Sequence, residues 1–204
     1  MNDVDYDETQ IGLKESINQD VTLDLSYSPS ETVNYYTYYT FDQGQAEQIG
    51  RSHNFFVPGA SSDPTRNWQA DLDDNSYTAG IGGNWSFLEN KATLKADYVF
   101  SESISDYTFG TGTNAAVAGA EDLPDLKTTL HRLTTIGEYE WSPTLSLGLS
   151  YWYENFSFDD FALDTFGGQD SLATTFTEVI LLSDTIQSYN AHVGMLYATC
   201  KFEM

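Results

Sequence analysis

The 204-residue chain carries 31 acidic and 8 basic residues, which gives a formal net charge of −23. This balance argues against a nucleic-acid partner, because binding to phosphates needs clustered lysine and arginine. No apolar run approaches the roughly 18 to 20 residues that a membrane-spanning helix needs, and a helical membrane protein is therefore excluded. The single Cys200 excludes an internal disulfide framework.

Seven strands are predicted from the alternation of apolar and polar residues along the chain. Their approximate ranges are 20–28, 32–43, 76–87, 91–104, 128–141, 144–157 and 188–203. The clearest alternation lies in 144–157, where Leu145, Leu147 and Leu149 share one face and small polar residues occupy the other. The strand at 32–43 is aromatic on both faces, so its orientation is the least defined.

The strands pair as hairpins with short turns at one end and long connections at the other, at about 44–74, 106–126 and 158–187. In most of these strands one face is apolar, with tyrosine and tryptophan near its ends, whereas the other face is polar; the strand at 188–203 alternates least well. This pattern predicts an all-β fold, an antiparallel transmembrane β-barrel in the bacterial outer membrane, with lipid on the apolar side. The short turns are expected at the periplasmic end and the long loops outside the cell.

The number of strands indicates a partial barrel, with residues 1–204 forming one barrel segment. Single-chain bacterial barrels close with an even number of strands from about eight upward, and residues 1–18 could supply an eighth strand. The predicted lumenal face is mostly serine, threonine, glycine and asparagine, which fits a wide or cargo-filled lumen. We therefore expect the C-terminal part of a larger barrel. The acidic start of the chain lacks the features of a signal peptide, so Met1 is not expected to begin the complete precursor.

Several short motifs, in this order along the chain, resemble the C-terminal portion of the MtrB/PioB family of outer-membrane β-barrels. They span about residues 20–202. The motifs are Leu25-Ser-Tyr-Ser-Pro-Ser-Glu31, Leu123-Pro-Asp-Leu-Lys-Thr128 with His131-Arg-Leu133, Tyr151-Trp-Tyr-Glu154 with Asp160-Phe-Ala-Leu-Asp164, and Ser188-Tyr-Asn-Ala-His-Val193.

The resemblance implies a sheath for multihaem c-type cytochromes in an extracellular electron-transfer conduit. The barrel would hold a periplasmic-facing multihaem cytochrome in its lumen and meet an extracellular multihaem cytochrome at its outer mouth. Haem would belong to these partners, and the barrel would carry no cofactor of its own. Outer-membrane lipid would surround the wall and would be insulated by it from the haem chain.

Four polar residues are candidates for the lumenal face: Asn84, Asp97, Arg132 and Glu138. In the sheath reading they contact the cytochrome through hydrogen bonds and water, and in the simpler reading they line a wet lumen. Asp71, Asp73 and Asn75 place oxygen ligands at alternate positions, as a calcium loop does. This stretch is not an EF-hand, because serine and glycine stand where that loop needs glycine and glutamate. It is a weak calcium candidate beside the simpler reading of a solvated strand entrance.

No motif in the sequence supports enzyme activity, since the three histidines are scattered and neither a phosphate loop nor a nucleophile elbow is present. Two other classes stay open beside the sheath. One is a porin-like outer-membrane channel whose acidic lumen selects cations. The other is a soluble acidic β-rich surface module, which would fold in buffer without detergent.

Overall fold

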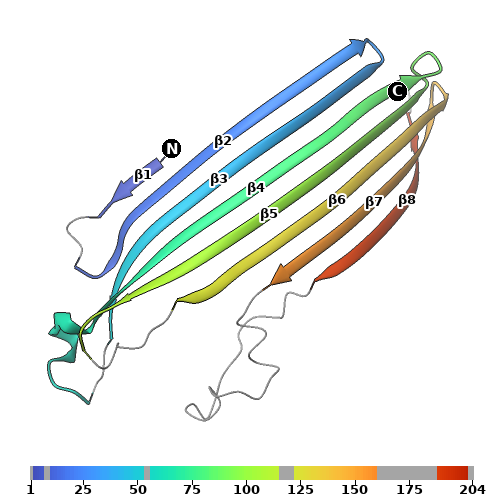
Figure 1. The fold of residues 1–204 in the computed structure, drawn as a ribbon. Helices are drawn as coiled ribbons and strands as arrows, with labels where there is room; N and C mark the ends of the chain where they lie inside the picture. Colours follow the sequence, from blue (N-terminus) through green and yellow to red (C-terminus); the bar gives the residue numbers. More distant parts are fainter. Residues whose placement is uncertain (1, 7–9, 53–55, 115–121, 160–187, 202–204) are drawn as a thin grey trace.

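The computed structural model describes residues 2–6, 10–52, 56–114, 122–159 and 188–201. These residues form one antiparallel sheet in which each strand pairs with its neighbours in the chain (Figure 1). The strands are β1 (Asn2–Asp5), β2 (Gly12–Ser30), β3 (Val33–Arg51), β4 (Asn67–Phe87), β5 (Ala92–Thr111), β6 (Leu123–Ser142), β7 (Leu145–Asp159) and β8 (Tyr189–Cys200). The sheet is curved and stays open between β1 and β8 in the part of the chain described. It has the architecture of a barrel wall, as predicted.

Two short 3-10 turns, η1 (Ala60–Ser62) and η2 (Pro64–Arg66), lie in the connection between β3 and β4. Asp63 caps η2, because its carboxylate accepts hydrogen bonds from the backbone nitrogen and the hydroxyl of Thr65 at 2.9 and 2.7 Å. These bonds favour the charged form and hold the pKa of Asp63 below its ordinary value. Across the described ranges, no helix has the length and apolarity to cross a membrane.

The strands are longer than the alternation of apolar residues predicted. The predicted connection 44–74 shrinks to 52–66, and 106–126 shrinks to 112–122, because β2 to β6 extend by several residues at this end. The cause is visible in the register: Gln19 with Gln43 on one face, and Asp20 with Asp42 on the other, continue the ladder with polar residues. Hydropathy carries no signal for such a strand. The third predicted loop, 158–187, lies outside the described residues apart from its first two.

Residues 1–18 supply the eighth strand, but only in part. β1 is short and pairs Asn2–Asp5 with Glu15–Asn18, while Gly12 onward already belongs to β2. Within the described part of the chain, the remainder of β2, including the whole predicted range 20–28, pairs only with β3. The predicted last strand begins at Tyr189, and its described part ends at Cys200.

The register separates two chemically different faces, because residues paired across antiparallel strands project to the same side of the sheet. One continuous row links Leu25, Thr37, Ile81, Tyr98, Leu133 and Tyr153 from β2 to β7. Many large side chains of this face are exposed, among them Leu25 at 68% and Ile81 at 61%. The neighbouring rows carry tyrosine, glycine, threonine and charged residues. We call these two sides the apolar face and the polar face.

The apolar band occupies only part of each strand. A tilted strand crosses the hydrocarbon core with about 9–11 residues, whereas β2 to β6 contain 19 to 21 residues. The band also shifts along the register from strand to strand. At the end nearer the long connections, the first apolar residue of the band is Val21 in β2 and Tyr153 in β7. Tyr153 lies in register with Leu25 and not with Val21. This shift is what strands inclined to the membrane normal require.

The short turns β2–β3, β4–β5 and β6–β7 all lie at one end of the sheet, as predicted (Figure 1). The β4–β5 turn carries Leu88, Glu89 and Asn90 with φ of 51°, 57° and 69°. At the other end the strands continue past the apolar band into the longer connections. The wall therefore projects from the membrane on the side of the long connections.

The face assignment predicts different costs for the same charge on neighbouring residues of β7. We expect Leu149→Arg, near the middle of the apolar band, to destabilise the intact barrel by about 2–4 kcal/mol, whereas Ser150→Arg on the polar face changes its stability little. The measurement is urea unfolding of each variant in phospholipid vesicles. Equal losses for the two variants would contradict the assignment of the faces.

Candidate functional site: the polar face of the sheet

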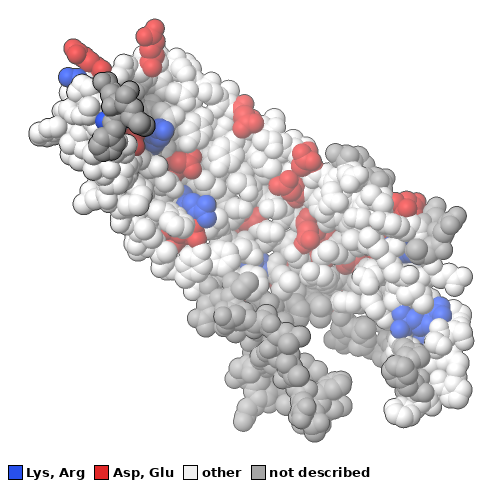
Figure 2. Space-filling model, turned by 180° about the vertical axis from the view of Figure 1, so that it is seen from behind, with Lys and Arg blue, Asp and Glu red and all other residues white. Residues whose placement is uncertain are grey.

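The four residues predicted to face the lumen lie on the polar face. Asn84 is paired with Lys95, Asp97 with Thr134, Arg132 with Val99, and Glu138 with Thr93. These pairs occupy neighbouring rows of the same side of β4, β5 and β6. Acidic side chains are scattered along the length of the sheet on the side seen from behind (Figure 2).

Asp97 belongs to a bridge that spans three strands. The Tyr36 hydroxyl of β3 donates a hydrogen bond to Asp97 Oδ2 of β5 at 2.8 Å, across Gly82 of β4. Glycine is needed at the middle position, because a Cβ atom there would lie 2.5 Å from Tyr36 Cζ and 2.8 Å from the Ala96 carbonyl oxygen. The ring of Tyr36 thus lies over the backbone of the intervening strand.

Glu138 belongs to a second bridge of the same construction. The Tyr197 hydroxyl of β8 donates to Glu138 Oε1 of β6 at 2.7 Å, across Gly148 of β7. A Cβ atom on Gly148 would lie 2.1 Å from Tyr197 Cζ. Both bridges satisfy a carboxylate on the wall with a tyrosine from two strands away, and both lay an aromatic ring flat on the polar face.

Arg132 stands in a cluster with Glu154, Trp152 and Tyr189. Its Nε donates to Glu154 Oε2 at 2.6 Å, and its guanidinium carbon lies 5.4 Å from the centroid of the Trp152 ring. The Tyr189 hydroxyl donates to the other carboxylate oxygen, Oε1. The Glu154 side chain is only 5% exposed, so the ion pair is shielded on the carboxylate side and open on the arginine side.

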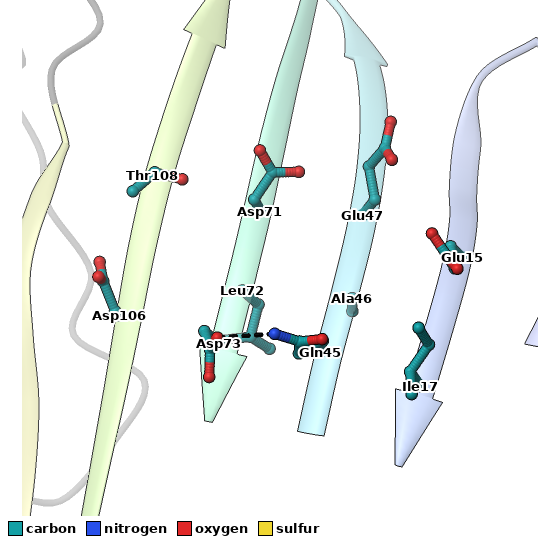
Figure 3. A pocket seen from close by; sticks show the side chains of 10 residues that line it. All are labelled: Glu15, Ile17, Gln45, Ala46, Glu47, Asp71, Leu72, Asp73, Asp106 and Thr108. Carbon is teal, nitrogen blue, oxygen red and sulfur yellow. Dashed lines mark hydrogen bonds between the residues drawn. The ribbon is translucent and has the colours of Figure 1, made fainter. Parts of the chain in front are cut away.

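The calcium candidates Asp71, Asp73 and Asn75 lie on β4 and not in a loop, on the continuation of the apolar face beyond the membrane band. Asp71 and Asp73, but not Asn75, border a groove of about 390 Å³ together with Glu47 and Asp106 (Figure 3). Asp73 already accepts hydrogen bonds from the amide nitrogens of Asn75 at 2.6 Å and Gln45 at 2.8 Å. No group of three or more acidic, histidine or cysteine residues among those described could hold a metal ion.

The alternation in 144–157 puts Trp152 and Glu154 opposite Leu149, on the polar side of β7, but gives them no partner. It also does not single out Tyr36, Tyr189 or Tyr197. The sequence signal available for these tyrosines was the alternation of residues between the two faces, since each tyrosine falls on a polar-face position of its strand. Their hydrogen bonds depend on which glycine and which acid lie beside them two strands away. That information requires the register.

An antiparallel sheet that is apolar on one side, polar on the other and banded across its strands is the wall of a transmembrane barrel. The comparisons identify the family. A family model described as "Putative outer membrane beta-barrel porin, MtrB/PioB" matches residues 2–202. The chain belongs to this family and is an outer-membrane β-barrel protein. This finding excludes the soluble surface module.

Among curated proteins, the chain is similar to "Outer membrane protein MtrB" from Shewanella baltica (strain OS185). The two are 26% identical over 198 residues, which cover 97% of this chain and 26% of the relative. The chain thus spans about a quarter of the length of the relative that it matches. This share agrees with the open sheet of Figure 1, in which further strands are needed for closure.

The glycine bridges predict that a single methyl group disturbs the polar face. In Gly148→Ala the Tyr197 ring must move, and loss of its bond to Glu138 should cost the intact barrel about 1 kcal/mol. The matched control is Gly137→Ala, because a Cβ atom there would meet nothing within 4 Å. Urea unfolding in detergent micelles compares the variants. A loss in Gly137→Ala as large as in Gly148→Ala would argue against the bridge.

Proposed function

We propose that this chain forms part of an outer-membrane sheath that encloses multihaem c-type cytochromes in an extracellular electron-transfer conduit. A periplasmic-facing multihaem cytochrome occupies the lumen, and an extracellular multihaem cytochrome meets the outer mouth. The haem groups belong to these partners. The barrel has no cofactor of its own and catalyses no reaction.

The observation that carries this proposal is the composition of the polar face. Protein–protein interfaces are enriched in tyrosine, tryptophan, arginine and methionine, and the described polar face contains all four types. The large residues on it include Tyr36, Tyr38, Trp152, Tyr189, Met195, Tyr197 and Arg132. Of these, Met195 is 55% exposed and Tyr189 is 45% exposed. A wall that only contains water has no need of such side chains, whereas a folded protein in the lumen would bury them.

The wall would act physically. The ladder gives backbone N–H and C=O groups hydrogen-bond partners on neighbouring strands, because lipid hydrocarbon offers none. The apolar band separates the lumen from lipid, so that electrons pass between haems held by the partners rather than through the wall. The extension beyond the membrane would place the outer mouth away from the lipid surface, where an extracellular partner can approach it.

A porin-like channel is the second candidate, and the carboxylates of Asp97, Glu138 and Glu154 on the polar face favour it. An acidic lumen filled with water would select cations. The two candidates differ in what occupies the lumen. In a sheath the lumen is blocked by protein, and in a channel it conducts.

Purification of the intact barrel under mild conditions separates these candidates. We expect the barrel from native membranes to carry the absorption spectrum of c-type haem, with the haem bound covalently to other chains on a denaturing gel. In planar bilayers the same preparation should conduct few ions. A haem-free barrel with cation-selective conductance would establish the channel and refute the sheath.

A further inference from the structure

The most specific polar group that the wall leaves unused is the end of the Arg132 side chain. An arginine guanidinium has five N–H donors, and its two terminal nitrogens present four of them as a planar fork. Only Nε of Arg132 is engaged with Glu154. Among the described residues, the terminal nitrogens form no hydrogen bond, and the side chain is 44% exposed.

Three contacts fix the direction of this fork. Glu154 holds Nε from the side, Trp152 supports one face of the guanidinium, and Tyr189 holds the remaining oxygen of Glu154. Because the side chain is already ordered, a ligand that binds the fork avoids most of the entropic cost of immobilising a long arginine. An arginine that served only to neutralise Glu154 would gain more by pairing with it through two nitrogens, end to end.

No described residue beside Arg132 accepts a hydrogen bond from its terminal nitrogens. Its register neighbour on β5 is Val99, which offers no side-chain acceptor, and Thr134 follows it on the same face of β6. Asp97 is the carboxylate of the adjacent row, and it accepts a hydrogen bond from the Tyr36 hydroxyl. The fork therefore opens toward the space in front of the polar face.

We propose that Arg132 is a carboxylate-binding anchor on the lumenal wall, with Trp152 and Glu154 as its positioning residues. A carboxylate matches the two parallel donors of the fork. It also fits this face better than a phosphate, because Glu154, Asp97 and Glu138 would repel a doubly charged anion more strongly. The inference rests on the proposed function for the source of the ligand, which is either a haem propionate or an acidic side chain of the cytochrome in the lumen.

The test compares Arg132→Gln with Lys95→Gln in the intact barrel with its cytochrome. Lys95 is exposed on the same face, and its substitution removes the same charge. We expect Arg132→Gln to raise the dissociation constant of the cytochrome roughly ten- to hundredfold, as loss of a charge-assisted hydrogen-bond pair implies. Lys95→Gln should raise it less than about threefold. Equal effects of the two variants would overturn the anchor.

Redox titration of the same complexes distinguishes the two sources of the carboxylate. If the ligand is a haem propionate, Arg132→Gln lowers the reduction potential of one haem, because a positive charge beside it is lost, and Lys95→Gln leaves that potential unchanged. If the ligand is an acidic side chain, the affinity falls and no haem potential shifts. Both results support the anchor.

A cytochrome-free measurement keeps the anchor testable if the proposed function fails. Acetate, compared with chloride at equal ionic strength, should slow the reaction of Arg132 with phenylglyoxal in the empty barrel, as mapped by mass spectrometry. Arg51 at the end of β3, whose Nε and Nη1 donate to Asn67 and to the Ser61 carbonyl, serves as the internal reference. Equal protection of Arg132 and Arg51, or protection of neither, would overturn the anchor whether or not a cytochrome is found.

Discussion

The interaction on which this structure depends is the hydrogen bond between neighbouring strands. In hydrocarbon every backbone N–H and C=O must find a partner within the protein, and a barrel wall meets this demand only through its ladder. Once the ladder is set, side chains alternate between two sides with a period of two. A slip of one residue in any strand would send its apolar residues to the polar side. The register therefore decides at once what contacts lipid and what faces the lumen.

The same ladder explains why the strands exceed the membrane. Within the apolar band, leucine, isoleucine and aromatic residues supply the contact with lipid on one side. Beyond it, backbone pairing continues while the outward residues become polar, as the pair Glu47 and Asp71 illustrates. The wall is thus one continuous sheet whose outward side contacts lipid in one part and water in the other. Its chemistry changes along the strand and not at a domain boundary.

This continuity accounts for what could be predicted from the sequence. Every strand with an apolar band was found, and most were given their faces, because residues such as Leu25 and Leu149 alternate with polar residues. The strand at 32–43 was predicted without a defined orientation, since aromatic residues occupy both of its faces. The extensions were missed, since Gln43 and Asp71 give no apolar period although they pair as well as Leu25 does. The described strands leave the sheet open between β1 and β8, and the alternation within single strands carries no information on how a sheet closes.

The polar face was predictable as a surface but not as a set of interactions. The alternation of residues along each strand is enough to place four residues on the polar face: Asn84, Asp97, Arg132 and Glu138. It does not reveal that Tyr36 reaches Asp97 over Gly82, since the three residues come from three strands. These contacts give the wall its flat aromatic surface, on which the proposed role as a protein-enclosing sheath depends.

The alternation of surroundings along β7 tests the central claim most directly. Spin labels would be placed one at a time at positions 145–154 of a cytochrome-free barrel in liposomes, with exposed Cys200 replaced by serine. We predict that collision with oxygen, which concentrates in lipid, peaks at 145, 147, 149, 151 and 153. Collision with a water-soluble nickel chelate should peak at the positions between them. Accessibility without a period of two, or with the two probes in phase, would contradict the assignment of lipid to one face and lumen to the other.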